Sequence, residues 1–261
     1  MAKHLLPVKV DRGKGPVVVL LHGLGNNHKS WSYALKHLSS SVRVIVPDLL
    51  GFGDAPKPKV QYTPADHAEA VIATLDKLDI KDALIAGHSM GCIVAVEVAV
   101  RRPDLASQLV LAGAPIYQRA PRSGWMDRLF HTEGFYFSIF YAIKNNPEAT
   151  KFAGKVADDT APLVKGMEIT DETWPAFRGS LEHTIMQYQT FGQLKQLRTP
   201  TLFLNGIFDF FIIRRVTARA VRANRRYLRS KTLLGPHELT PRQGRRIASI
   251  ISRLAHKGQT K

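Results

Sequence analysis

Serine, aspartate and histidine side chains follow three strand-like runs of residues at the points where each run ends. Ser89 lies within Gly87-His88-Ser89-Met90-Gly91, whereas Asp209 and His237 follow two later runs. A serine hydroxyl is a weak nucleophile near neutral pH, so it needs an adjacent base, and that base needs an acid to orient it. If the runs are parallel strands, their carboxyl ends meet at one edge of a sheet. The pattern therefore predicts Ser89 as nucleophile, His237 as base and Asp209 as orienting acid.

The residues around Ser89 have the form of a sharp turn from strand to helix. Glycines stand two positions before and two after the serine, where strand and helix come too close for most side chains. Such a turn holds the hydroxyl out of the sheet beside a helix N-terminus. An oxyanion formed there needs two backbone donors. We expect the amides of Met90 and of Leu24, in the glycine loop His22-Gly23-Leu24-Gly25, to supply them.

Two other residues compete for the roles of base and acid. His88 adjoins the nucleophile in sequence, so its side chain should diverge from that of Ser89. Asp48 also ends a predicted strand, but it precedes the serine, whereas the order serine, acid, histidine is expected for this kind of turn. We expect Asp48 to cap backbone donors of the glycine loop that follows it. Because the five-residue serine pattern also occurs by chance, much of the argument depends on Asp209 and His237.

Strand-like runs that alternate with helical patterns predict the elements that position these residues. The expected strands are residues 8–10, 17–21, 42–46, 83–86, 108–112, 199–206 and 227–234. Helical spacing is found in residues 31–38, 64–78, 90–102, 214–224 and 241–255. This alternation predicts an α/β fold with a mostly parallel, doubly wound sheet.

The alternation stops between residues 116 and 197, where helical blocks rich in aromatic residues occur without a convincing strand. An all-helical insertion after a strand end is typical of a lid over a site at the carboxyl edge of a sheet. We therefore predict a core formed by residues 1–115 and 198–261, with a helical cap at 116–197. Most of the aromatic residues should form the core of the cap, and Trp125, Phe130 and Phe137 are expected to line the substrate site.

Composition limits the class of protein. The chain has 261 residues, of which 44% are hydrophobic, as expected for a globular α/β domain with an insertion. No stretch approaches the roughly 20 apolar residues of a membrane span. The first residues lack the apolar region of a secretory signal, so a cytoplasmic location is expected. The one cysteine, Cys92, excludes an intrachain disulfide and a cysteine-rich metal site, and we expect it to be a packing residue.

The net charge of +16 is unevenly distributed. Residues 210–261 contain 14 Lys and Arg residues and a single acid, Glu238. One interpretation is an anionic partner, either a membrane surface or nucleic acid. The other is a set of solvated helix faces, because no base-stacking aromatic residues are interleaved with the arginines. Both interpretations stay open at this point.

Taken together, these motifs resemble the α/β-hydrolase fold family across nearly the whole chain. The features that carry the resemblance are His22-Gly23-Leu24-Gly25 with Trp31, Asp48-Leu49-Leu50-Gly51-Phe52-Gly53, Gly87-His88-Ser89-Met90-Gly91, Asn205-Gly206 leading to Asp209, and His237 after Gly235-Pro236. The resemblance implies an eight-stranded, mostly parallel sheet with an inserted helical cap, as in lid-bearing esterases and carbon–carbon bond hydrolases.

The sequence departs from the family pattern at two positions. Asp54 stands where relatives often have serine, and Cys92 stands where glycine is frequent. Serine at position 89 argues against the haloalkane dehalogenase and epoxide hydrolase branches, because these need a carboxylate nucleophile.

The resulting hypothesis is a serine hydrolase, without metal or cofactor, that cleaves small-molecule carboxylic esters of small to medium apolar acyl groups. Alternatives with the same three residues are hydrolysis of a carbon–carbon bond in a vinylogous diketone, and lipase, thioesterase or cofactor-free perhydrolase activity. An alternative of another class is a non-catalytic binding protein that uses the basic C-terminal surface.

Overall fold

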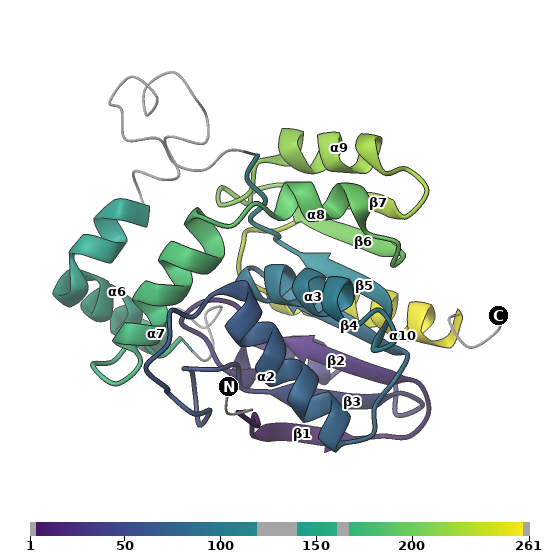
Figure 1. Ribbon diagram of the computed structural model, residues 1–261, viewed down its shortest axis with the longest axis horizontal. Helices are drawn as coiled ribbons and strands as arrows, with labels where there is room; N and C mark the ends of the chain where they lie inside the picture. Colours follow the sequence, from purple (N-terminus) through teal and green to yellow (C-terminus); the bar gives the residue numbers. More distant parts are fainter. Residues whose placement is uncertain (1–3, 119–139, 161–166, 258–261) are drawn as a thin grey trace.

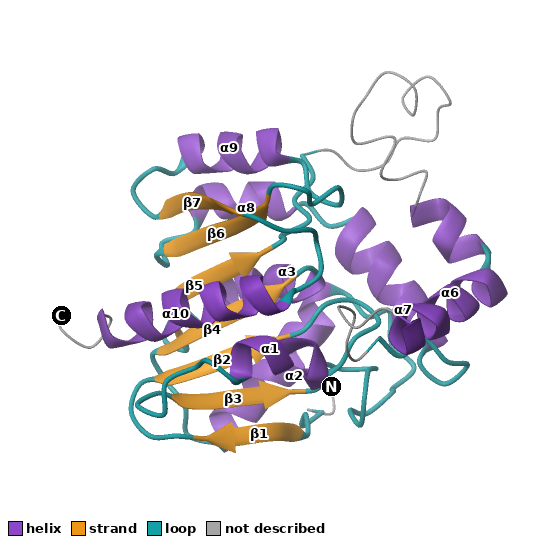
Figure 2. Ribbon diagram, turned by 180° about the vertical axis from the view of Figure 1, so that it is seen from behind, coloured by secondary structure: helices purple, strands orange, loops and turns teal. Residues whose placement is uncertain are grey.

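A central sheet with helices on both faces organises the protein (Figures 1 and 2). The computed structural model describes residues 4–118, 140–160 and 167–257. Its strands are β1 (Val8–Arg12), β2 (Val17–Leu21), β3 (Arg43–Pro47), β4 (Ala83–His88), β5 (Ala106–Ala112), β6 (Thr201–Gly206) and β7 (Leu228–Leu233). They lie in the order β1-β3-β2-β4-β5-β6-β7, with β1 antiparallel to β3 and all other pairs parallel. The prediction of a mostly parallel, doubly wound α/β sheet is confirmed.

The number of strands differs from the expected number. The described residues form a seven-stranded sheet, so the expectation of eight strands is wrong by one. All seven strands overlap ranges that the sequence predicts as strands, and the eighth was implied only by the family resemblance. Before β2 the chain supplies a single strand, β1, and the described residues that precede it, 4–7, are not in a strand.

Different helices cover the two faces of the sheet. One face carries α2 (Pro64–Lys77), α3 (Met90–Arg101), α8 (Thr190–Gln196) and α9 (Arg214–Ala223). The other carries α1 (Ser32–Leu35), which follows the 3-10 helix η1 (His28–Trp31), and α10 (Pro241–Lys257). Side chains of a strand alternate between these faces: Val19 and Leu21 pack in the first core, whereas Val18 and Leu20 pack in the second. Burial on both faces explains the unbroken apolar runs in the sequence.

A further group of helices lies at the carboxyl end of the strands (Figure 1). It contains α6 (Pro147–Thr160), α7 (Trp174–Gly179) and the π-helix η2 (Ser180–Met186), and residues 140–145 are also helical. Two buried hydrogen bonds join η2 to the α2 region: Thr184 Oγ1 donates to the carbonyl oxygen of Tyr62 (2.7 Å), and His67 Nε2 lies 2.9 Å from Ser180 Oγ. These contacts fix η2 above the edge of the sheet where the candidate residues meet.

The limits of the cap, residues 116–197, stay a prediction. Within this range, α8 packs against α3 and α9 in the helical layer on the sheet. The three aromatic residues expected to contact substrate, Trp125, Phe130 and Phe137, lie outside the described residues. Among the helices that are described, none is both long enough and apolar enough to cross a membrane.

Candidate active site

Ser89 occupies the sharp turn between β4 and α3. Its backbone has φ 52° and ψ −121°, a conformation that residues other than glycine rarely adopt. The amide of Ser89 donates to the carbonyl oxygen of Ala112 on the neighbouring strand (2.9 Å), which helps to hold the turn in place. A strained non-glycine residue between a buried strand and a buried helix is often found at a functional site.

The glycines on either side of Ser89 are required by close backbone contacts. A Cβ atom at Gly87 would lie 2.4 Å from the carbonyl carbon of Gly91, and one at Gly91 would lie 2.4 Å from the carbonyl oxygen of Leu21. Both distances are shorter than any normal contact, so a side chain at either position would push α3 away from the sheet. The Gly-x-Ser-x-Gly pattern is thus a consequence of how closely helix and strand pack.

The structure brings Ser89, His237 and Asp209 together at the carboxyl edge of the sheet. His237 Nε2 lies 2.9 Å from Ser89 Oγ, and His237 Nδ1 lies 3.0 and 2.9 Å from the two carboxylate oxygens of Asp209. With Nδ1 donating its proton to the carboxylate, Nε2 is an acceptor that faces the serine hydroxyl. This is the arrangement of a nucleophile, a base and an orienting acid.

Two further contacts hold Asp209 and His237 in place. Asp209 is buried in the turn after β6, where its Oδ1 accepts the amide of Phe211 at 3.0 Å. His88 is also buried, and its Nε2 donates to the carbonyl oxygen of His237 at 2.9 Å. The side chain of His88 thus contacts the backbone of His237, the residue whose ring faces the serine.

Charges around His237 set its pKa. Burial acts to lower the pKa of the imidazole, but the hydrogen bond and charge of Asp209, together with the charge of Glu238, outweigh it and raise the pKa above its ordinary value of 6.5. The buried ring of His88 lies 5.1 Å from the ring of His237, and burial lowers the pKa of His88. A neutral His88 is therefore set beside an imidazole that gains a proton readily.

The raised pKa of His237 leads to an expected pH dependence. A base must be neutral to accept the serine proton, so kcat/KM for a neutral ester is expected to rise with pH through an apparent pKa above 6.5. Glu238→Gln removes one of the charges that favour the imidazolium. In this variant the rise of kcat/KM with pH, the acid limb of the pH profile, should therefore shift to lower pH. The measurement is the pH profile of kcat/KM for both proteins.

The matched control for this experiment is Glu69→Gln, which removes an exposed carboxylate on α2. Its acid limb should coincide with that of the unchanged protein. An acid limb that stays in place in Glu238→Gln would contradict a role of this carboxylate in setting the pKa of His237.

The glycine loop at residues 22–25 lies against the nucleophile. A Cβ atom at Gly23 would lie 3.1 Å from the Cβ of Ser89, and Leu24 lines the same cavity as the serine. His22 fixes this loop, because its Nδ1 donates to the carbonyl oxygen of Gly23 (2.9 Å) and its Nε2 accepts the amide of Leu49 (2.8 Å). Burial lowers the pKa of His22 to about 4, so the ring stays neutral and keeps both bonds near neutral pH.

Asp48 and Cys92 form no hydrogen bond with the side chains of Ser89, Asp209 or His237 in the described structure. Asp48 accepts the amides of His28 (2.8 Å) and Asp54 (3.1 Å), so it caps the loop after β3 as expected. The buried Cys92 thiol contacts the carbonyl oxygens of Gly87 and Ala112, and burial raises its pKa well above the ordinary value. A thiol in that state packs and does not act as a nucleophile.

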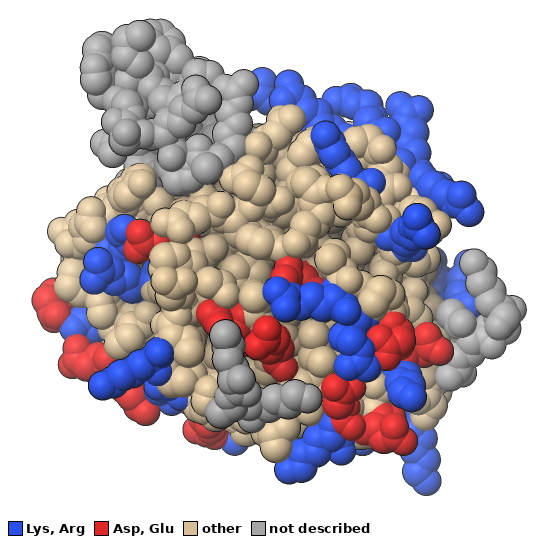
Figure 3. Space-filling model, in the orientation of Figure 1, with Lys and Arg blue, Asp and Glu red and all other residues tan. Residues whose placement is uncertain are grey.

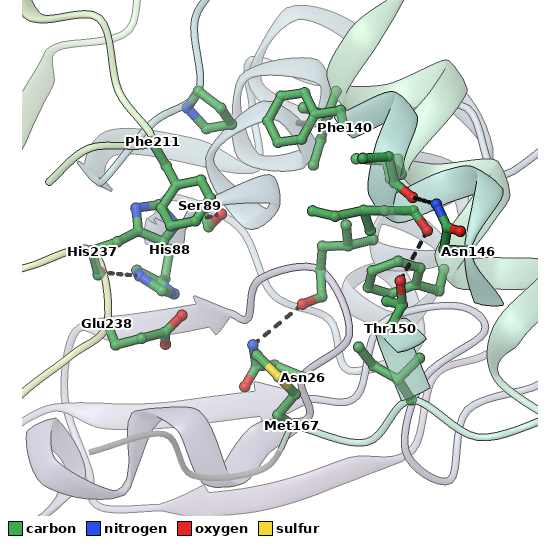
Figure 4. A pocket seen from close by; sticks show the side chains of 18 of the residues that line it. Asn26, His88, Ser89, Phe140, Asn146, Thr150, Met167, Phe211, His237 and Glu238 are labelled. Atoms are coloured by element: carbon green, nitrogen blue, oxygen red, sulfur yellow. Dashed lines mark hydrogen bonds between the residues drawn. The ribbon is translucent and has the colours of Figure 1, made fainter. Parts of the chain in front are cut away.

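A cavity of about 520 Å³ opens beside Ser89 and His237 (Figure 4). Its polar or ionisable side chains, apart from these two, come from Asn26, His88, Asn146, Thr150 and Glu238. The apolar part of the wall, which is the larger part, consists of Leu24, Pro115, Phe140, Ala142, Ile143, Ala149, Met167, Ile169, Phe177, Leu181, Ile185 and Phe211. No lysine or arginine is found among the described residues that line it. The cavity therefore suits a neutral, largely apolar group next to the serine.

Several of these residues could not be identified from the sequence. Glu238 directly follows His237 in the sequence, and Phe211 lies two positions after Asp209. Both therefore reach the cavity. The ring of Phe211 lies 5.0 Å from that of His237. Proximity to Asp209 and His237 was the available signal for both. The cap residues Leu181 and Ile185 gave no comparable signal, because they belong to a helical apolar pattern that also occurs in a buried core.

Comparisons with known proteins agree with the fold. A family model described as alpha/beta hydrolase fold matches residues 16–217. The haloalkane dehalogenase of Mesorhizobium japonicum is 35% identical over 130 residues, which is 50% of this chain and 40% of the relative. The 2-hydroxymuconate semialdehyde hydrolase of Pseudomonas sp. strain CF600 is 34% identical over 108 residues, which is 40% of this chain and 38% of the relative. The chain thus spans less than half the length of the curated relatives it matches.

Among solved structures, a thermophilic esterase from Thermogutta terrifontis superposes with a TM-score of 0.74 at 21% sequence identity. The superposition covers 98% of this chain and 94% of the other. At this identity the likeness concerns the fold.

Proposed function

The chain belongs to the alpha/beta hydrolase fold family, and we propose that it is a serine hydrolase that cleaves carboxylic esters of small to medium apolar acyl groups. The observation that carries this proposal is the pair of contacts from His237 to Ser89 Oγ (2.9 Å) and to Asp209 (2.9 Å), set in the wall of an apolar cavity. Serine at position 89 counts against the carboxylate chemistry of the dehalogenase and epoxide hydrolase branches.

In the proposed reaction, Ser89 Oγ attacks the ester carbonyl carbon while His237 Nε2 takes the hydroxyl proton. The tetrahedral intermediate then collapses: the bond to the leaving oxygen breaks, and His237 returns the proton so that an alcohol departs. A water molecule attacks the acyl-enzyme and gives a proton to His237. Collapse of the second intermediate releases the carboxylic acid and restores the hydroxyl of Ser89. Asp209 holds the imidazole in the required tautomer and stabilises its charged form.

The amides of Leu24 and Met90 are the proposed donors to the oxyanion. Met90 is the first residue of α3, and the first amides of a helix have no partner within the helix. The loop that contains Leu24 lies against Ser89 and is fixed by His22. Each such donor contributes roughly 2.7–4 kcal/mol in the transition state.

The charges in the cavity wall favour ester cleavage over the carbon–carbon alternative. The vinylogous diketone substrate of that alternative carries a carboxylate, which needs a cation to replace its hydration. The described wall offers no lysine or arginine, and it places the carboxylate of Glu238 beside His237. A neutral acyl group meets no such penalty.

A substrate panel tests this assignment. We expect p-nitrophenyl esters of neutral acyl groups, from butyrate to octanoate, to be cleaved with the highest kcat/KM. The singly charged p-nitrophenyl succinate should be cleaved at least about tenfold more slowly than butyrate, since a difference of about 1.4 kcal/mol in the transition state is enough. Glu238→Gln should reduce the difference in kcat/KM between p-nitrophenyl succinate and p-nitrophenyl butyrate. Fast cleavage of a dienoate diketone with negligible ester turnover would overturn the proposal in favour of the carbon–carbon hydrolase.

A further inference from the structure

Four exposed apolar side chains occur in the five residues after β6. The exposed fractions are 43% for Ile207, 54% for Phe208, 78% for Phe210 and 42% for Phe211. Leu234, 51% exposed, lies beside them, because the amides of residues 207 and 208 donate to the carbonyl oxygens of Leu233 and Gly235. We call these five side chains, Ile207, Phe208, Phe210, Phe211 and Leu234, the apolar tip. A cluster of this kind on a protein surface is typical of an interaction site.

An arginine-rich helix face begins three residues after the apolar tip. In α9, Val216, Thr217 and Ala220 are buried against the sheet layer. At 100° per residue, the exposed Arg214, Arg215, Arg219 and Arg222 fall on the opposite side of the helix, and Arg225, Arg226, Arg229 and Lys231 continue the basic surface toward and along β7. We call these eight residues the arginine face. No Asp or Glu occurs in the sequence between residues 210 and 237.

The concentration of charge is visible on the surface. Figure 3 shows Lys and Arg side chains crowded along the upper edge of the molecule, over α9, without acidic side chains between them. On the rest of this view, basic side chains lie among acidic ones. Elsewhere on the protein arginines form ion pairs with acids, for example Arg102 with Asp104 and Arg101 with Glu69. Ion pairs with described acids are not seen for Arg214, Arg222, Arg225 or Arg226. Their charge is therefore available to an external anion.

We propose that the arginine face and the apolar tip together dock onto an anionic phospholipid bilayer. Arginines at a negatively charged membrane surface contribute about 1 kcal/mol each, and Phe and Leu side chains beside such a basic surface enter the boundary between headgroups and acyl chains. Nucleic acid is the less favoured occupant. Base stacking needs aromatic rings interleaved with the cations along a groove, whereas here the three phenylalanines are gathered at one end of the arginine face.

The position of the apolar tip relates this surface to the candidate active site. Phe211 lines the cavity beside Ser89, so the tip lies at the cavity wall. Docking would bring this side of the cavity close to the bilayer, where apolar substrates accumulate. The docking proposal does not depend on the proposed reaction, because it concerns binding alone.

The test is flotation of the full chain with vesicles at low and high salt. One vesicle population contains phosphatidylcholine only, and the other contains equal amounts of phosphatidylcholine and phosphatidylglycerol. We expect binding to the anionic vesicles that weakens with added salt, and little binding to the neutral ones. Phe210→Ser and the double variant Arg214→Gln/Arg222→Gln should each lower the partition coefficient, the latter by at least about tenfold.

Two matched variants serve as controls. Phe152→Ser changes another exposed phenylalanine (71%), which lies on α6, away from α9. Arg245→Gln/Arg246→Gln removes the same charge from the exposed face of α10, on the other side of the sheet. Both should bind vesicles like the unchanged protein, and all variants should keep its thermal transition.

The proposal would be overturned by absence of binding to anionic vesicles at low salt. It would equally be overturned if the control variants lost as much binding as the test variants, since the surface would then lie elsewhere. Binding to a duplex or single-stranded oligonucleotide without binding to anionic vesicles would replace the bilayer by nucleic acid as the occupant.

Discussion

Ser89→Ala is expected to lower kcat for p-nitrophenyl butyrate by about 10⁴-fold or more, with little change in the thermal transition. The expectation follows from the 2.9 Å contact between Ser89 Oγ and His237 Nε2, because without the hydroxyl no acyl-enzyme can form. Removal of a nucleophile costs nearly as much as removal of the whole set of cooperating residues. Steady-state kinetics of the purified variant measure the effect. The double variant Ser89→Ala/His237→Ala should have a kcat only slightly lower than that of Ser89→Ala.

The control for this experiment is Ser107→Ala. Ser107 lies on β5, where its hydroxyl donates to the carbonyl oxygen of Asp82 near the opposite edge of the sheet. It should keep kcat within a few-fold of the unchanged protein. A fluorophosphonate reagent should label the unchanged protein and Ser107→Ala, but not Ser89→Ala. Unchanged turnover in Ser89→Ala would exclude the serine mechanism, and absence of labelling in the folded protein would favour a non-catalytic binding protein.

Asp209→Asn is expected to lower kcat by about 10⁴-fold while the protein stays folded. An asparagine amide facing His237 Nδ1 would favour the tautomer with its proton on Nε2. That proton would point at Ser89, so the imidazole could no longer accept the serine proton. The imidazole of His237 would also lose the carboxylate that raises its pKa. The residual kcat/KM should therefore change less with pH between 6 and 8 than that of the unchanged protein.

Asp48→Asn serves as the comparison for Asp209→Asn, because we expect it to affect stability and not kcat. Asp48 accepts the amide of Asp54 in the loop after β3 and the amide of His28 at the start of η1, so its replacement should reduce the free energy of unfolding by roughly 1–3 kcal/mol. Its kcat, measured on the folded fraction, should stay within a few-fold. The assignment of Asp209 fails if the two variants show the reverse, with chemistry lost in Asp48→Asn and retained in Asp209→Asn.

The arrangement of Ser89, Asp209 and His237 could be predicted because it depends on topology. Residues that end parallel strands meet at one edge of a sheet, however far apart they are in sequence. The order of β4, β6 and β7 in the sheet brings the three loops together, and the glycines at 87 and 91 identify which serine lies on the sharp turn. The positions of the inner strands follow from apolar runs that a doubly covered sheet requires, whereas the edge strands β1 and β7 carry polar, exposed residues.

The wall of the cavity could not be predicted in the same way. Which face of a cap helix points to the serine depends on how that helix packs on the core, and its apolar pattern is the same for either face. Leu181 and Ile185 line the cavity because η2 is held to Tyr62 and His67 by two buried hydrogen bonds between residues more than a hundred positions apart. The hydrogen bond from His88 to the carbonyl oxygen of His237 is another contact that depends on the folded path of a loop.

The helices α6, α7 and η2 lie in the chain between two adjacent strands, which has a consequence for how this protein could change over evolution. β5 and β6 pair directly, and α8 returns the chain to the start of β6, so α6, α7 and η2 all belong to one continuous stretch between β5 and α8. Exchange of that single stretch, by recombination or by design, would alter the wall of the cavity and leave the order of the strands unchanged. The stretch that supplies most of the residues in the cavity wall is thus continuous in the sequence and separate from the segments that carry Ser89, Asp209 and His237. A different preference for the group bound in the cavity could therefore arise by replacement of that stretch, while the arrangement of Ser89, Asp209 and His237 is kept.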